Sequence, residues 1–240
     1  IYDLPKRIVR HELMDSPLRV SAMRSLGAYA NIFGIESFMD ELAHQAGVDP
    51  LDFRLRHLQD ERAKAVLQAI ADRVGWRSRT VDAGHGWGIS FARYKNKQTY
   101  CAVAVEVVVD TTTGRIQLKR AVIGADSGQI INPDGLSNQL EGGFVQAASW
   151  TLFEQVDWDT TGVRSHDWET YPILSFPDAP VIQVVMLNRP QLPTMGAGEA
   201  SQNPTPAAIA NAVYAAVGVR LRTIPFTPQV VLDALSDMGE

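Results

Sequence analysis

The feature that most constrains the fold is a change of hydrophobic period along the chain. Between residues 31 and 74, apolar residues recur every three or four positions, which places them on one face of an α-helix. From about residue 100 the pattern has a period of two and is rich in β-branched residues, which is typical of strands. Because the strands are grouped in the middle with helices around them, the sequence predicts an α+β fold rather than an alternating parallel sheet.

Three helices are predicted in the first part of the chain. The first is expected over residues 31–46. Asp49 followed by Pro50 is an N-cap with a first-turn proline and opens the second helix. Asp60 opens a third helix, which Gly75 ends. We therefore expect a compact helical segment here.

The middle of the chain is predicted to be mainly antiparallel. Residues 100–109 and 115–123 form strand-like runs joined by a short polar turn, which favours a hairpin, and residues 89–94 are a candidate preceding strand. Helical spacing returns over residues 136–150. Residues 181–187 are expected to form a buried strand.

A glycine- and proline-rich loop separates that strand from a C-terminal helix. The helix is expected from Thr205 to about residue 217, where Gly218 stops it, and a last short helix is expected over residues 230–235. These patterns divide the chain into a helical segment, residues 1–76, and an α+β domain, residues 77–240.

Composition excludes several classes of function. The chain of 240 residues carries 22 Lys and Arg against 27 Asp and Glu, with no basic run, so nucleic acid is not an expected partner. Cys101 is the single cysteine, which excludes an intrachain disulfide, and one thiol is too few for an iron–sulfur cluster or a structural zinc. The five histidines show no metal-ligand spacing.

The same composition bears on localisation. The most apolar stretch, residues 207–217, is about half the ~20 residues that a membrane span needs. The first residues show no apolar run of the kind found in signal peptides. We expect a cytoplasmic protein without a membrane span, with the periplasm as the alternative.

The most informative stretch is Gly196-Ala197-Gly198-Glu199, between a predicted strand and a predicted helix. Glycines let the backbone approach a ligand, and a carboxylate held by such a turn at the edge of a cleft can act as a general base. The alternative is a tight strand-to-helix turn with a solvated glutamate. A dinucleotide-binding loop is rejected because Ser201 occupies the position of the third glycine.

Two further stretches are weaker candidates. The loop of residues 126–133 leads into Gln139-Leu140-Glu141-Gly142-Gly143 and offers backbone N–H donors for an anion. Arg24, beside a glycine near a helix start, could bind a carboxylate or a phosphate. The alternatives are a surface loop with a helix packed through its glycines, and an arginine that only caps or pairs at the surface.

Taken in order, these stretches resemble the C-terminal part of the molybdenum-binding subunit in the xanthine dehydrogenase and aldehyde oxidase family. The resemblance covers about residues 17–235 and is nearest to the bacterial isoquinoline oxidoreductase and nicotinate dehydrogenase types. It is carried by six segments, Met23-Arg24-Ser25-Leu26-Gly27, residues 36–43, residues 47–54, Ile131-Asn132-Pro133, residues 139–146, and Gly196 to Glu199 with residues 206–213.

The resemblance implies roles for particular residues. It makes Glu199 the catalytic base, which takes the proton from a molybdenum-bound hydroxide as that oxygen attacks an aldehyde or N-heterocycle carbon and hydride passes to a sulfido ligand. It places Arg24, Gln139, the Gly142-Gly143 pair and the turn Gly196-Ala197-Gly198 at the molybdopterin. Many members have a glycine directly after the arginine, where this chain has Ser25.

The resemblance also implies partners and cofactors. A molybdenum–molybdopterin would be shared with an upstream half, while iron–sulfur clusters and any flavin or haem would lie on other domains or on a small [2Fe-2S] subunit. The isolated chain would then be a domain of a molybdopterin-dependent oxidoreductase without a complete active site. Two other hypotheses stay open: a non-catalytic binding or assembly module with the same fold, and an unrelated small-molecule-binding α+β protein.

Overall fold

The computed structural model describes residues 1–6, 8, 10, 12, 16, 18, 22–80 and 82–238. The main helices are α1 (Ala28–Gln45), α2 (Pro50–His57), α3 (Glu61–Val74), α4 (Pro133–Leu152), α5 (Thr205–Val217) and α6 (Pro228–Ser236). The strands are β1 (His85–Arg93), β2 (Tyr100–Val109), β3 (Ile116–Asp126), β4 (Trp158–Asp159), β5 (Gly162–Val163) and β6 (Val181–Met186). Short 3₁₀ turns are η1 (Trp76–Ser78), η2 (Tyr94–Asn96) and η3 (Phe176–Asp178).

The predicted helix ends in the first part are confirmed by their caps. The side chain of Asp49 accepts hydrogen bonds from the N–H groups of Leu51 and Asp52, and Asp60 caps α3 in the same way. Gly75 ends α3 with a left-handed backbone, φ 69°. The first helix begins at Ala28, three residues earlier than its apolar pattern indicated. Its first turn was missed because it carries no capping side chain.

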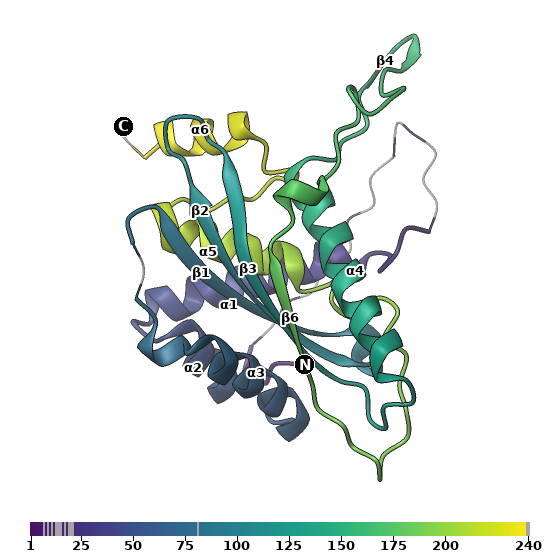
Figure 1. Ribbon diagram of the computed structural model, residues 1–240. Coiled ribbons are helices and arrows are strands. Elements are labelled where there is room, and N and C mark those ends of the chain that lie inside the picture. Colours follow the sequence, from purple (N-terminus) through teal and green to yellow (C-terminus); the bar gives the residue numbers. More distant parts are fainter. Residues whose placement is uncertain are drawn as a thin grey trace.

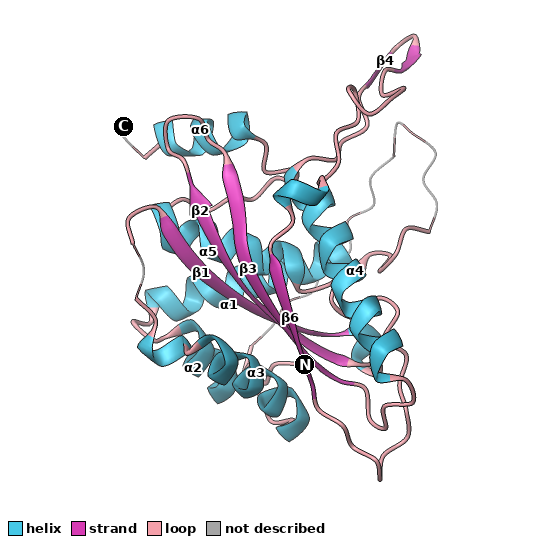
Figure 2. Cartoon of the chain, viewed as in Figure 1, coloured by secondary structure: helices cyan, strands magenta, loops and turns pink. Residues whose placement is uncertain are grey.

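Four strands form one sheet in the order β1-β2-β3-β6, and helices cover both of its faces (Figures 1 and 2). β1, β2 and β3 are antiparallel neighbours, as predicted. The α+β class is also confirmed. The division at residue 76 stays a prediction; in the structure α3 packs on β2 and β3.

The last strand differs from expectation in two ways. β6 runs parallel to β3, so the sheet is mixed rather than wholly antiparallel. It is also an edge strand, half-buried along most of its length, with Val181 67% exposed. An apolar run of this length does not reveal whether both faces or one face will be covered, which is why the buried strand was wrongly predicted.

One face of the sheet packs on α3, and the other packs on α4 and α5. Trp87, Ile89 and Phe91 of β1 belong to the cluster with α3. The alternate residues of β1 include Gly86 and Gly88, where an added Cβ would overlap backbone oxygens of Ala212 and Ala208 in α5. Glycine at these positions lets the helix axis come unusually close to the strand.

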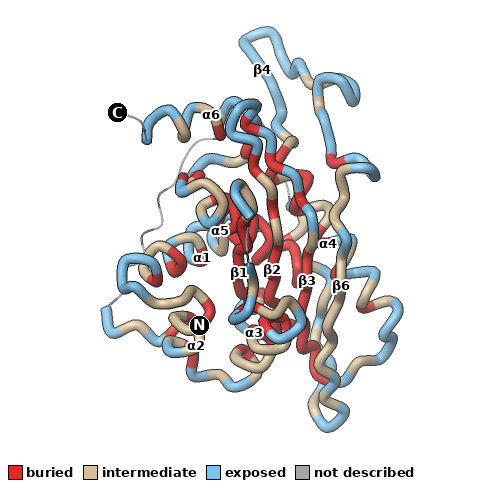
Figure 3. Tube along the Cα trace, turned by 60° about the vertical axis from the view of Figure 1, so that its left-hand side comes forward, coloured by how far each residue is buried: buried red, intermediate tan, exposed pale blue. Residues whose placement is uncertain are grey.

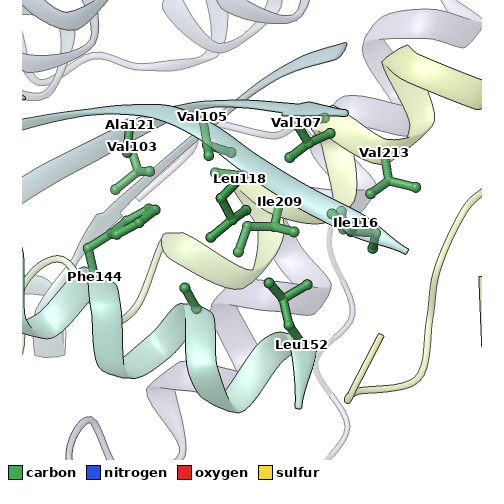
Figure 4. Close-up of a cluster of buried hydrophobic side chains, with 14 of the residues drawn as sticks. Val103, Val105, Val107, Ile116, Leu118, Ala121, Phe144, Leu152, Ile209 and Val213 are labelled. Carbon is green, nitrogen blue, oxygen red and sulfur yellow. The ribbon is translucent and has the colours of Figure 1, made fainter. Parts of the chain in front are cut away.

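The larger core lies between β2, β3, α4 and α5 (Figure 4). Val103, Val105 and Val107 of β2 point to the same side of the sheet, as strand alternation requires, and meet Phe144 of α4 and Ile209 of α5. The burial map shows these strands as the buried centre of the molecule (Figure 3). This core fixes α4, which carries candidate site residues, against α5, which follows the glycine-rich turn.

A projecting arm was not predicted. It contains the two-residue strands β4 and β5 and stands away from the body (Figures 1 and 3). Both strands are exposed. Of the helices that the structure describes, none is both long and apolar enough to cross a membrane.

Candidate functional site

Glu199 lies against the turn that precedes α1, although 174 residues separate the two segments. The backbone N–H of Ser25 donates a hydrogen bond of 2.7 Å to Glu199 Oε1. Beside it, Arg24 Nε donates a hydrogen bond of 2.7 Å to the carbonyl oxygen of Gly198. Glu199 is half-buried, so its carboxylate is held in place and still open to a ligand.

Arg24 also reaches α4, where it joins a second candidate. One terminal nitrogen donates to Gln139 Oε1 at 2.9 Å, and the other donates to Gln146 Oε1 at 3.1 Å. Partial burial lowers the pKa of Arg24, and the nearby Glu199 carboxylate opposes that shift. The guanidinium therefore ties the turn before α1, α4 and the glycine-rich turn together.

Ser25 holds a backbone conformation that few side chains adopt. Its φ is 79°, and the next residue, Leu26, has φ 50°. Left-handed backbone at non-glycine residues costs about 1–3 kcal/mol and clusters at functional sites. The geometry explains why glycine is well suited to this position, and it aims the Ser25 N–H at Glu199.

The two glycines of α4 have different surroundings. At Gly143 an added Cβ would overlap Ser201 Oγ and lie 3.4 Å from Arg24 Nη2. The absence of a side chain at Gly143 therefore lets the segment around Ser201 pack closely against α4. At Gly142 an added Cβ would meet nothing within 4 Å. Gly143 is therefore explained by packing inside the chain, whereas Gly142 is exposed and faces open space.

The glycine-rich turn is also held by two residues in the connection between β1 and β2. Gln98 Oε1 accepts a hydrogen bond of 3.1 Å from the N–H of Gly196, and Thr99 Oγ1 donates one of 2.8 Å to the Gly196 carbonyl oxygen. Gln98 and Thr99 lie in the connection between β1 and β2. Sequence reasoning missed this connection because no local pattern marks a contact across 97 or 98 residues.

The loop that follows β3 is built differently from expectation. The buried carboxylate of Asp126 accepts hydrogen bonds from Arg62, from Arg189 and from the N–H of Gly128. Burial alone would raise the pKa of Asp126, but these hydrogen bonds outweigh it and the pKa is lowered. The N–H of Gln129 is also bonded, to the Leu192 carbonyl oxygen at 3.1 Å. The expectation of free N–H donors in this loop was therefore wrong at Gly128 and Gln129.

A shallow cleft of about 270 Å³ opens beside these residues. It is lined from three segments: the loop after β3, the first turns of α4, and the glycine-rich turn. Among the candidates it includes Gln139, Ala197 and Gly198. Of the cofactor-binding candidates, the structure brings Gln139, Ala197 and Gly198 together in this cleft, with Glu199 next in the chain to its last lining residue, whereas Gly142 lines a different cleft with Phe176 and Ile182.

Buried polar atoms without partners gather in the same region. In the part of the chain that the structure describes, Ser25 Oγ, Tyr94 Oη, Gln202 Oε1 and Asn203 Oδ1 are shielded from solvent and make no hydrogen bond. A buried polar group left unpaired costs about 1–3 kcal/mol, so such atoms are rare and call for an explanation. Asn203 and Ser25 are both bonded to Glu199 through other atoms.

No metal site made from side chains alone accompanies this arrangement. Within the described residues, no three His, Cys, Asp or Glu side chains gather as metal ligands would.

Comparison with known proteins gives these features a context. A family model described as a molybdopterin cofactor-binding domain matches residues 25–180. The second subunit of nicotinate dehydrogenase from Pseudomonas putida is 40% identical over 253 aligned positions, which cover 100% of this chain and 21% of that protein. The beta chain of isoquinoline 1-oxidoreductase from Brevundimonas diminuta is 30% identical, over 95% of this chain and 29% of that protein.

Solved structures share the fold. Quinoline 2-oxidoreductase from Pseudomonas putida 86 superposes with a TM-score of 0.81 at 15% identity, covering 90% of this chain and 53% of that one. Aldehyde oxidoreductase from Desulfovibrio gigas gives a TM-score of 0.76 at 16% identity, covering 90% and 42%. The chain spans about a fifth to a third of the length of the curated relatives named above.

Proposed function

Because this chain belongs to the family of molybdopterin cofactor-binding domains, we propose that it forms one wall of a molybdenum hydroxylase active site, with Glu199 as the base. The observation that carries the proposal is the hydrogen bond from the Ser25 N–H to Glu199 Oε1, at the edge of the cleft lined by Gln139 and Gly198. It holds a half-buried carboxylate in a defined position beside the cleft that we propose for the cofactor.

The residues present fit a molybdopterin. The cofactor is an extended, hydrogen-bonding molecule, and the region beside the cleft offers unpaired polar atoms at Gln202, Asn203 and Ser25. Gln139 and the turn Gly196-Ala197-Gly198 would line its path. An orphaned polar atom at a site of this kind is satisfied when a polar ligand arrives.

Within such a site, Glu199, Ser25 and Arg24 would have separate roles. Glu199 would accept a proton at the carboxylate oxygen that Ser25 leaves free, and the Ser25 N–H would keep the other oxygen oriented. Arg24 would hold the backbone at Gly198, so that the carboxylate does not drift when its charge changes. When bound, the cofactor supplies the two-electron redox chemistry that no side chain here can provide.

The complete activity requires more polypeptide than this chain contains. We infer a hydroxylation of an aldehyde or N-heterocycle, with an upstream half completing the cofactor site. A small [2Fe-2S] subunit would carry the electrons away, because the single thiol, Cys101, is fully buried in the core. Two of the relatives are named as subunits, which supports an assembly of several chains.

The test is Glu199→Gln in the complete enzyme. The amide keeps the size of the side chain and loses the proton-accepting oxygen, so turnover is expected to fall by at least about 10²-fold. Molybdenum content, measured by mass spectrometry, should stay near normal because the backbone of the turn is unchanged. Glu61→Gln, an exposed glutamate paired only with Lys64, is the matched control and should keep full turnover. Near-normal turnover in Glu199→Gln would remove this residue from the base role.

A further inference from the structure

The projecting arm, residues 153–180 between α4 and β6, has an unusually apolar surface (Figure 3). In the described part of the chain, 15 large apolar side chains are exposed, and six of them lie in this short segment. Trp168 is 73% exposed and Phe176 is 95% exposed. Single exposed apolar residues are ordinary, whereas a cluster of them marks a surface that binds another molecule.

The arm is held in shape by its own hydrogen bonds. β4 and β5 pair as a short hairpin, and beside it Arg164 Nε donates a hydrogen bond of 2.7 Å to Asp159 Oδ2. Near β6, the N–H of Leu174 donates a hydrogen bond of 2.8 Å to Ser149 Oγ of α4. A surface that is already shaped loses less conformational entropy when it binds. The arm therefore presents its exposed apolar side chains in defined positions.

The arm is also strongly acidic. It contains six Asp and Glu residues and one basic residue, Arg164, so with histidine neutral its net charge is -5. The net charge of the whole chain is also -5, which means that the residues outside the arm balance to zero. The excess negative charge of the protein is thus concentrated on the segment where exposed apolar side chains cluster.

A cleft of about 850 Å³ continues this surface at the base of the arm. It is lined by the arm, α4 and β6, and its apolar residues include Val145, Ile173 and Ile182. The carboxylate residues Glu141 and Glu154 line the same cleft. Apolar contact area bordered by carboxylates is therefore found at the base of the arm as well as along it.

The two properties of the arm together define the kind of partner that fits it. Exposed tryptophan and phenylalanine are typical anchors of protein–protein interfaces, where they fill apolar pockets. The carboxylates repel the phosphates of nucleic acids and of anionic lipids, and they attract Lys and Arg. The arm of a second copy would bring the same charge of -5 against this one. Complementarity thus favours a basic protein surface with an apolar recess, outside residues 1–240.

We propose that the arm is a docking element for another polypeptide of the complete enzyme, which binds it through a Lys- and Arg-rich surface, with Trp168 and Phe176 as the anchors. That this partner belongs to the enzyme rests on the proposed function, whereas the docking surface does not depend on the role of Glu199. Docking here does not use the residues that line the cleft beside Gly198, because the two clefts share no lining residue.

The direct test is site-specific photo-crosslinking in the complete enzyme. Benzoylphenylalanine in place of Trp168 or Phe176 is expected to link the arm to a Lys- and Arg-rich segment outside residues 1–240, which mass spectrometry of the linked peptides identifies. Gln229, exposed on α6, is the control position and should not link to that segment. Links only within residues 1–240, of the same or a second copy, would overturn the proposal. So would links to an acidic segment, or no protein link at all.

Limited proteolysis measures the contribution of the two anchors. Arg164 is the only Lys or Arg in the sequence of the arm, so trypsin can cut the arm at that position alone. Docking should shield this bond in the complete enzyme. Trp168→Ala combined with Phe176→Ala should therefore raise its rate of cleavage at least about tenfold, as expected for interface anchors.

The matched control is Ile35→Ala combined with Phe38→Ala, which removes two exposed apolar side chains from α1 and should leave cleavage at Arg164 unchanged. Equal cleavage of the parent and the arm variant would overturn the proposal. Because Trp168 and Phe176 are exposed, their replacement should not lower the melting temperature.

These measurements are separate from the test of the base. Neither crosslinking nor cleavage at Arg164 requires turnover, so both keep their meaning if Glu199→Gln remains active. Loss of turnover in Glu199→Gln, together with an arm that is cut equally in the parent and the arm variant, would overturn the docking proposal and leave the proposed base in place.

Discussion

At the scale of single residues, the site depends on backbone geometry as much as on side chains. Glu199 is oriented by a main-chain N–H, and that N–H belongs to Ser25, whose φ of 79° strains any residue with a Cβ. Strain of this kind is retained where it aims a group at a ligand or at another residue. The turn before α1 therefore orients the Glu199 carboxylate through the Ser25 N–H. The effect of its conformation on stability can be measured without measuring catalysis.

Replacing Ser25 with glycine should relieve the strain. Glycine adopts positive φ without cost, and the lost hydroxyl is one of the unpaired buried atoms, so Ser25→Gly is expected to stabilise the fold by up to about 1 kcal/mol. Ser25→Val, with a β-branched side chain in the same conformation, should destabilise it by at least about 2 kcal/mol. Chemical denaturation measures both free energies of unfolding. A glycine variant less stable than the parent would contradict the assigned strain.

Residue-level prediction from the sequence worked where the signal was local. Asp49, Asp60 and Gly75 have short-range roles at helix ends, so their positions in the chain were enough to predict them. Glu199 stood out only as a carboxylate after glycines, and the family resemblance is what favours a site over the alternative of a solvated turn glutamate. Gln98 was missed because its hydrogen bond with Gly196 spans 98 residues, which no local spacing encodes.

At the scale of elements, the close packing of β1 against α5 fixes the position of α5. Gly86 and Gly88 lie directly against the helix backbone, and α5 follows the segment that holds Glu199. The position of α5 thus depends on the absence of two side chains from a neighbouring strand. The direction of β6 could not be predicted for a related reason, because pairing with β3 is a long-range contact.

Gly88→Ala tests this packing. The added Cβ would overlap the Ala208 carbonyl oxygen, a backbone atom that can move only with α5, so the free energy of unfolding should fall by at least about 2 kcal/mol. Gly34→Ala in α1 is the control, since its Cβ would meet nothing within 4 Å and alanine favours a helix by about 1 kcal/mol. Equal stability of the two variants would show that β1 and α5 are not in such contact.

At the scale of the whole molecule, the site is open on one side. The cleft beside Gly198 is shallow, and the nearby buried side-chain oxygens of Gln202 and Asn203 make no hydrogen bond to the described residues. Typical sites enclose most of a ligand's surface, and this surface alone does not. The sequence predicted the α+β class from its periodicity, but it could not predict which face of the finished fold would carry this open cleft.

The isolated chain of 240 residues is therefore expected to fold without retaining molybdopterin. Its two hydrophobic clusters are buried within the chain itself, whereas the proposed cofactor would be contacted from one side only. Metal analysis of the purified chain should find far less than one molybdenum per molecule, and no aldehyde oxidation. Stoichiometric molybdenum together with turnover would contradict the proposed division of the site.

The large sequence separation between Ser25 and Glu199 also determines when their hydrogen bond can form during synthesis. The hydrogen bond joins residues 174 positions apart, so it cannot form while the chain is still short of its last fifth during synthesis. At about 5–20 residues per second, roughly 9–35 s pass between the two residues leaving the ribosome's catalytic centre. Through that interval the turn before α1 has no carboxylate to orient. A factor that inserts a cofactor would therefore meet the contact between Ser25 and Glu199 only after Glu199 itself has been made.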